Sequence, residues 1–257
     1  MSPGPVTSLP VASLPVASLP RAPFPPDPER GAAAVALVAT TAEVLAHPEL
    51  DERLLAPWER RRLAGIRVPA RRDDVVVARL LLRLCASRVT GLPPDAVEPA
   101  QRCPGCGRDG HGRPYLPDHP ELGVSYSHAD GLAAAAVGPG PVGIDVEPLT
   151  RRPGPLSVLR RMLPKDEVDA ARAGPDPGPA LLRLWVRREA LFKAGFEGGF
   201  GGGFEAGRDD VRLTAWTDHR RAAVVALAGA DGALAPSLSS GPAPLPFSSG
   251  PAPPSGR

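Results

Sequence analysis

Apolar and polar positions along the middle of the chain follow two different periods, and each period predicts a type of element. Between 71 and 89 the apolar residues recur at helical spacing, which predicts an amphipathic helix with Arg79 and Arg83 on another face. Strands are expected at 124–128 and 132–137, and Asp130-Gly131 between them predicts a β-hairpin. Further strands are expected at 32–38, 142–147, 211–216 and 222–227, and further helices from 57 and at 156–163, 165–173 and 180–194. Hairpins without a strand–helix–strand alternation predict an α+β fold.

Proline is concentrated at both ends of the chain, where short sequences repeat. Ser-Leu-Pro recurs three times within residues 8–20, and Ser-Ser-Gly-Pro-Ala-Pro occurs at 239–244 and again at 248–253. Such segments cannot bury enough apolar surface to fold. We therefore predict a disordered Pro-rich tail at 1–30 and a disordered Pro/Ser/Gly-rich tail at 233–257.

The charge balance and the cysteines narrow the class of protein. The chain has 30 Lys and Arg against 28 Asp and Glu, a net charge of +2, so no nucleic-acid partner is expected. Three cysteines without a disulfide framework, and no recognisable export signal, predict a cytoplasmic protein. No apolar stretch reaches the length of about 18 residues that a membrane span needs, so no membrane partner is expected.

Carboxylates alternate with apolar residues in the predicted strand at 143–147. In an extended strand Asp145 and Glu147 share one face, while Ile144 and Val146 share the other. Paired carboxylates are typical Mg²⁺ ligands, and Mg²⁺ commonly bridges to substrate phosphates. The alternative is an exposed strand face with no metal.

A third carboxylate lies on the predicted helix at 180–194. Trp185, Glu189 and Lys193 are four residues apart and therefore lie on one helix face. Apolar neighbours on several sides of this helix favour partial burial of Glu189 and Lys193. The alternative is an ordinary Glu–Lys surface pair.

Two other segments offer groups that suit an anionic ligand. Ser127 and His128 end a strand just before a turn, where a ligand can reach them. Arg113 follows the His111-Gly112 turn, and an arginine fork matches phosphate oxygens.

The motifs and their order along the chain resemble those of the Sfp-type 4′-phosphopantetheinyl transferases. The order is Ser-His, then Gly-Ile-Asp-Val-Glu, then Trp-x-x-Arg-Glu-Ala-x-x-Lys. The resemblance covers roughly 35–232 and includes the arginines at 60–62 and the Cys103-x-x-Cys106 segment. It implies Mg²⁺-dependent transfer of 4′-phosphopantetheine from coenzyme A to a serine of an apo acyl or peptidyl carrier protein. Adenosine 3′,5′-bisphosphate would be released.

The resemblance also implies a role for each matching residue. Asp145, Glu147 and Glu189 would bind Mg²⁺, Glu189 would accept the proton of the carrier serine, and Lys193 would assist the leaving group. The remaining implied coenzyme A ligands, beside Asp145 and Lys193, are Arg60, Arg62, Arg72, Arg113, Ser127, His128 and Arg188.

The family fold implies two similar α+β halves, here 31–144 and 145–232, with coenzyme A between them. We expect a monomer that serves fatty-acid, polyketide or nonribosomal-peptide carriers. Four features depart from the family pattern: Arg188 replaces a usual lysine, Phe196 replaces a glycine, Ala129 replaces a frequent serine, and the glycine run at 198–203 is unusually long. The departure at Phe196 keeps open an inactive paralogue that acts as an interaction scaffold.

A zinc-binding module is the other alternative. Cys103 and Cys106 have the spacing of a zinc half-site, and His111 and His119 follow. The two histidines are eight residues apart, which is wider than a typical second half-site. This zinc knuckle is compatible with the transferase prediction, and its alternative is a tight turn with two free thiols.

Overall fold

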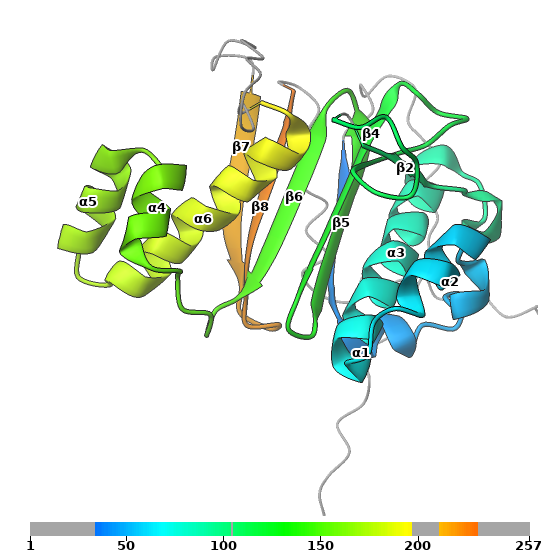
Figure 1. Ribbon diagram of the computed structural model, residues 1–257, viewed down its shortest axis with the longest axis horizontal. Helices are drawn as coiled ribbons and strands as arrows, with labels where there is room; N and C mark the ends of the chain where they lie inside the picture. The colour runs from blue at the N-terminus through cyan, green and yellow to red at the C-terminus, as the bar shows by residue number, and fades with distance from the viewer. Residues whose placement is uncertain (1–33, 104, 197–210, 231–257) are drawn as a thin grey trace, which may run out of the picture.

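The computed structural model describes residues 34–103, 105–196 and 211–230, in which two antiparallel sheets lie between helices (Figure 1). The first sheet has the strand order β1-β5-β4 and the second has the order β6-β8-β7. These strands are β1 (Val35–Thr40), β4 (Leu122–Ala129), β5 (Leu132–Pro139), β6 (Val142–Pro148), β7 (Val211–Asp218) and β8 (Ala223–Ala230). A small hairpin pairs β2 (Ala100–Arg102) with β3 (Arg113–Tyr115).

The helices gather on the two outer sides of the sheets (Figure 1). They are α1 (Thr41–Leu45), α2 (Pro57–Leu63), α3 (Pro69–Thr90), α4 (Leu156–Met162), α5 (Lys165–Ala173) and α6 (Pro177–Ala194). Two 3₁₀ turns lie at Glu52–Leu54 and Pro94–Ala96. The mixture of helices and antiparallel strands agrees with the α+β class expected from the sequence.

Separate clusters of buried side chains join the layers. One cluster packs α3 against one face of the first sheet, through residues such as Val77 and Ala135. A second joins the two sheets through residues such as Ala136, Ile144 and Leu227. A third packs α6 against the outer face of the second sheet. The order of the layers is therefore α3, first sheet, second sheet, α6.

Local sequence signals explain several boundaries. Asp130 and Gly131 both have positive φ angles, 42° and 87°, as a two-residue hairpin turn requires. Gly91 ends α3 in the left-handed conformation. Helix α6 begins at Pro177, three residues before its expected start.

Helix α3 differs from the amphipathic helix expected from its spacing. Arg79 and Arg83 are 3% and 1% exposed, because α2 lies over them and supplies the carboxylate of Glu59. The periodicity located the helix correctly, but the face that carries the arginines is also buried.

Several expectations lie outside the described residues, namely the two tails and the glycine run at 198–203. The division into halves at 144/145 stays a prediction, and that boundary falls inside β6. Within the described ranges, no helix combines the length and the apolar character needed to cross a membrane.

Candidate active site

The two carboxylates of β6 are buried beneath α6. Asp145 and Glu147 are 5% and 7% exposed. They pair in register with Ala226 and Val224 of β8, two residues that pack against α6. The alternating pattern of β6 therefore turns its acidic face toward α6, and the alternative of an exposed strand face is wrong.

Lys193 reaches this acidic face from the last turn of α6. Its Nζ lies 2.7 Å from Asp145 Oδ1. Gly143 permits the approach, since a Cβ there would lie 2.0 Å from the carbonyl oxygen of Ala190 and 2.5 Å from the backbone nitrogen of Ala194. Helix and strand are thus in backbone contact, and Lys193 forms an ion pair with the strand.

Strand β4 contributes a second contact to the same carboxylate. Ser127 Oγ donates a hydrogen bond of 2.7 Å to Asp145 Oδ1. Two residues earlier, Ser125 Oγ accepts a hydrogen bond of 3.0 Å from the backbone nitrogen of Ile144. Two serine side chains therefore link the edges of the two sheets, and one of them orients Asp145.

The acidic face retains negative charge that these contacts do not offset. Burial, and then the neighbouring Asp145, raise the pKa of Glu147 to about 7, although Arg151 and Lys193 act in the opposite direction. Asp145 Oδ2 is buried and receives no hydrogen bond. Carboxylate oxygens are the ligands that Mg²⁺ prefers, and Asp145 Oδ2 is available to bind it. The residues present therefore fit the metal expected from the sequence.

Glu189 lies one helical turn before Lys193 and is half-buried. Its carboxylate does not form a cluster with Asp145 and Glu147 in which all three ligand atoms lie within 4.8 Å of one another. Lys193 and Ser127 already occupy Asp145 Oδ1. The structure thus brings two of the three predicted ligands onto one buried strand face and places Glu189 on α6, the helix that packs against the second sheet.

His128 is half-buried at the end of β4. Burial lowers the pKa of its imidazole, while Asp74 partly opposes this effect and Lys193 reinforces it. Asp74 also holds the turn that follows, by accepting hydrogen bonds from the backbone nitrogen of Gly131 at 3.2 Å and from Thr41 Oγ1 at 2.7 Å. The lowered pKa favours a neutral ring at neutral pH, which can both donate and accept a hydrogen bond.

Among the predicted anion ligands, Arg113 lies at the end of α6. Its guanidinium packs so closely on Gly195, the residue that ends α6, that a Cβ at this position would lie 2.7 Å from it. Gly195 is two residues from Lys193, so these two cations approach the same end of one helix.

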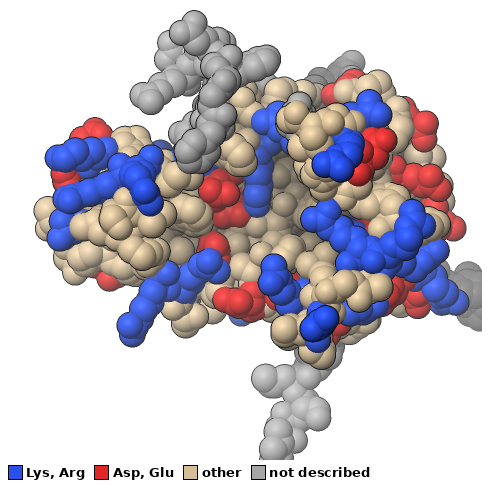
Figure 2. All heavy atoms as spheres, in the orientation of Figure 1, with Lys and Arg blue, Asp and Glu red and all other residues tan. Residues whose placement is uncertain are grey.

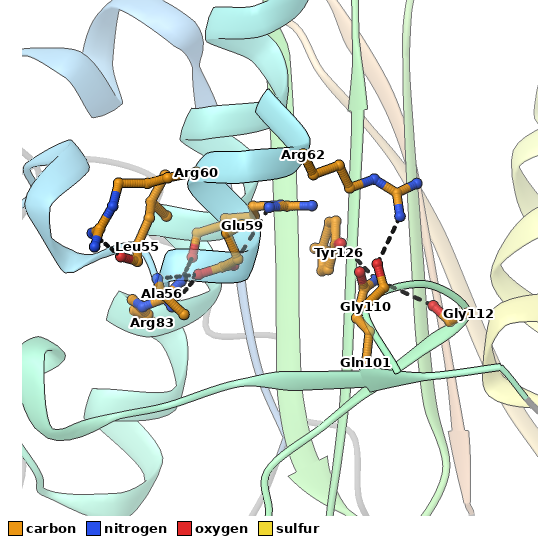
Figure 3. A network of polar contacts seen from close by, with 11 residues as sticks. Leu55, Ala56, Glu59, Arg60, Arg62, Arg83, Gln101, Gly110, Gly112 and Tyr126 are labelled. Atoms are coloured by element: carbon orange, nitrogen blue, oxygen red, sulfur yellow. Dashed lines mark hydrogen bonds and ion pairs between the residues drawn. The ribbon is translucent and has the colours of Figure 1, made fainter. Parts of the chain in front are cut away.

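The other predicted arginines have protein partners. Arg60 donates to the backbone oxygen of Leu55, and Arg62 donates at 2.7 Å to that of Gly110 (Figure 3). Arg72 forms an ion pair with Glu52. Arg188 lies half-buried on α6. Arg60, Arg62 and Arg72 thus contact groups other than the carboxylates of β6.

Sequence reasoning missed a buried charge network beside α3. Glu59 accepts hydrogen bonds from Arg83 and from the backbone nitrogen of Ala56 (Figure 3). Arg79 lies 3.8 Å from Glu59 and 5.1 Å from the ring centroid of Trp58. Arginines four residues apart within an apolar helix were the available signal, but nothing in the sequence identified Glu59 as their partner.

The surface has a hollow between the side that carries β6 and α6 and the side that carries α2 and α3 (Figure 2). Figure 2 shows Asp and Glu atoms on the side of the hollow that carries β6 and α6, and Lys and Arg atoms over α2 and α3 opposite. A separate hollow of about 420 Å³, lined by residues such as Leu159 and Leu181, lies at the other end of α6 from Lys193. The hollow beside β6 therefore has an acidic wall and a basic wall. Such a hollow suits a ligand whose phosphate groups bind a metal ion, because carboxylates can hold the metal and cations can contact the phosphates.

Comparisons with known proteins match part of the chain to one superfamily. Residues 141–233 match the model of the 4′-phosphopantetheinyl transferase superfamily. A curated relative from Bacillus subtilis, a 4′-phosphopantetheinyl transferase, is 26% identical over 157 residues, which cover 56% of this chain and 66% of the relative. Both findings support, for the matched part of the chain, the superfamily and the enzyme class expected from the sequence. The family match includes β6 and α6 but not Arg60, Arg62, Arg72 or Arg113.

Proposed function

We propose that this protein transfers 4′-phosphopantetheine from coenzyme A to a carrier protein, because residues 141–233 match the model of the 4′-phosphopantetheinyl transferase superfamily. The acceptor would be a serine of an apo acyl or peptidyl carrier protein, and adenosine 3′,5′-bisphosphate would leave. The observation that best supports the proposal is the buried carboxylate pair of β6 with Lys193 against it.

Asp145, Glu147 and Glu189 would hold Mg²⁺. When bound, the metal would offset the charge of the pyrophosphate and of the departing nucleotide. The donor set supports this role, because Asp145 Oδ2 has no hydrogen-bond donor, and because burial and then the neighbouring Asp145 raise the pKa of Glu147, which disfavours its charge without a cation. Ser127 donates to Asp145, so we assign it to the orientation of this ligand more than to contact with coenzyme A.

In the transfer, the serine oxygen of the carrier forms a bond to the phosphorus of the phosphopantetheine group. The bond between that phosphorus and the bridging pyrophosphate oxygen breaks. Glu189 would accept the serine proton, directly or through water, and Lys193 would stabilise the charge on the leaving oxygen.

Cationic and hydrogen-bonding side chains would hold the phosphates of coenzyme A. Arg113 and Lys193 are the best supported, since both lie at the C-terminal end of α6. The neutral ring favoured at His128 suits hydrogen bonding to a phosphate oxygen. Arg60, Arg62, Arg72 and Arg188 would complete the set only after exchanging or sharing their present partners.

The decisive experiment incubates the protein with coenzyme A, Mg²⁺ and apo carrier proteins of the fatty-acid, polyketide and nonribosomal-peptide types. Mass spectrometry should detect one phosphopantetheine group on at least one carrier. Replacing Asp145 with Asn or Glu189 with Gln should abolish transfer, while the exposed Glu98→Gln control should retain it. If folded protein modifies none of the carriers with Mg²⁺ or Mn²⁺, the interaction-scaffold alternative replaces this proposal.

A further inference from the structure

The loop between β2 and β3 gathers three side chains that are absent from the mechanism proposed above. Cys103, Cys106 and His111 each present a ligand atom, and these three atoms all lie within 4.8 Å of one another. Cys106 Sγ is 3.2 Å from His111 Nε2. Tetrahedral zinc, with Zn–S of about 2.3 Å and Zn–N of about 2.0 Å, holds neighbouring S and N ligands about 3.6 Å apart. The cluster therefore has the dimensions of a zinc site.

The backbone of the loop, and not chance contact of exposed side chains, creates this cluster. The backbone nitrogen of Gly107 donates to the carbonyl oxygen of Cys103 at 2.8 Å, which closes a tight turn around the first cysteine. Gly112 has a φ of +88°, and a Cβ there would lie 2.5 Å from the Cα of Cys103. The return of the chain at this glycine brings His111 back beside the two cysteines.

The chemistry of the ligands favours zinc over the other common cations. Thiolate and imidazole ligands select soft or borderline metals, whereas Mg²⁺ and Ca²⁺ prefer oxygen. Within the described part of the chain, no further His, Cys, Asp or Glu joins the cluster. His119, the fourth ligand considered from the sequence, is 3.3 Å from Glu121 and lies outside the group.

We propose that Cys103, Cys106 and His111 bind one zinc ion, with water in the fourth position, and that the ion fastens the β2–β3 loop. Arg113 starts the strand that leaves this loop, and its guanidinium packs on Gly195. By holding the β2–β3 loop, the ion would also hold the start of β3, from which Arg113 reaches the C-terminal end of α6. Metal binding here is independent of the proposed transferase reaction.

The loop is also tied to its surroundings on the opposite side. Gln101 Nε2 donates to the backbone oxygen of Gly112 at 3.1 Å and to Tyr126 Oη at 2.8 Å, while Arg62 holds Gly110 (Figure 3). These bonds would fix one side of the loop, and zinc would fix its exposed tip. We therefore expect removal of zinc to loosen 103–112 without unfolding the sheets.

The test uses the full chain without a histidine tag, purified under reducing conditions. Elemental analysis should find about one zinc per chain. Replacement of the zinc by Co²⁺ should produce the thiolate-to-cobalt absorption band. Cys106→Ser and His111→Ala should each weaken zinc affinity more than about tenfold, as loss of a ligand requires. His119→Ala is the matched control and should bind zinc like the wild type.

Three results would overturn the proposal. One is reduced, folded wild-type protein that takes up no zinc at a slight excess of the metal, or that gives no thiolate band with Co²⁺. Another is an equal loss of zinc from the His111→Ala and His119→Ala variants, with circular dichroism showing both to be folded. The third is a Cys103–Cys106 disulfide in protein prepared anaerobically, which would replace the zinc site with a redox pair.

Discussion

Replacing Glu147 with glutamine measures the free energy that the buried carboxylate pair costs the fold. Burial and the neighbouring Asp145 raise the pKa of Glu147 from 4.5 to about 7. A shift of this size corresponds to about 3 kcal/mol. Arg151 lies 3.2 Å from Glu147 and is itself partly exposed, so we discount the cost to about 1–2 kcal/mol for screening.

The sign of the effect depends on pH. Because the pKa is higher in the folded state, the folded protein binds this proton more tightly, and the stabilisation is complete below the unfolded pKa of 4.5. It is lost as the pH rises through about 7. Glutamine has no proton to lose, so Glu147→Gln should be more stable than the wild type by about 1–2 kcal/mol at about pH 8, and close to it at about pH 5.

Urea unfolding followed by circular dichroism at both pH values provides the measurement, with Glu98→Gln as the exposed control. The electrostatic reasoning fails if Glu147→Gln shows no gain at the higher pH, or the same gain at both. Because Glu147 is also a proposed metal ligand, the stabilised variant should lose carrier modification. Added Mg²⁺ should raise the stability of the wild type more than that of the variant.

Two further substitutions test other parts of the structure. Glu59→Gln leaves the buried Arg83 without its countercharge and should lower the free energy of unfolding by about 3–5 kcal/mol; a loss below about 1 kcal/mol in urea unfolding would contradict this. Gly195→Ala introduces a Cβ against Arg113 at a φ of +90°, so it should cost about 1–2 kcal/mol and raise the KM for coenzyme A. Gly174→Ala, where φ is −73°, is the control, and an equal KM in both variants would refute the role given to Arg113.

Local patterns in the sequence predicted most of the elements because their signals are short-range. The spacing of apolar residues predicted α3, and Asp130-Gly131 predicted the hairpin of β4 and β5. The strand alternation at 143–147 predicted that Asp145 and Glu147 share a face. It could not predict which layer that face meets, because this depends on the pairing of β6 with β8, about eighty residues later.

The contacts that complete the sites are long-range and have no local signal. The sequence predicts a role for Ser127 but not the hydrogen bond that its hydroxyl donates to Asp145, because that bond depends on the approach of two sheet edges. The sequence offers both His111 and His119 beside the two cysteines, whereas in the structure the turn at Gly112 brings His111 next to them. Arg83 interrupts an apolar pattern, and its partner Glu59 comes from another helix.

The alternation in β6 also explains how the fold tolerates a destabilised acidic face. Ile144 and Val146, at 0% and 1% exposure, lie in the cluster between the two sheets. Burial of each such side chain contributes about 1.5–3 kcal/mol, so the two together exceed the cost assigned to Glu147. Rotation of the strand to expose its carboxylates would expose both apolar side chains and break the bond from Ile144 to Ser125. The apolar half of β6 thus holds the acidic half under α6, where a divalent cation would relieve its charge.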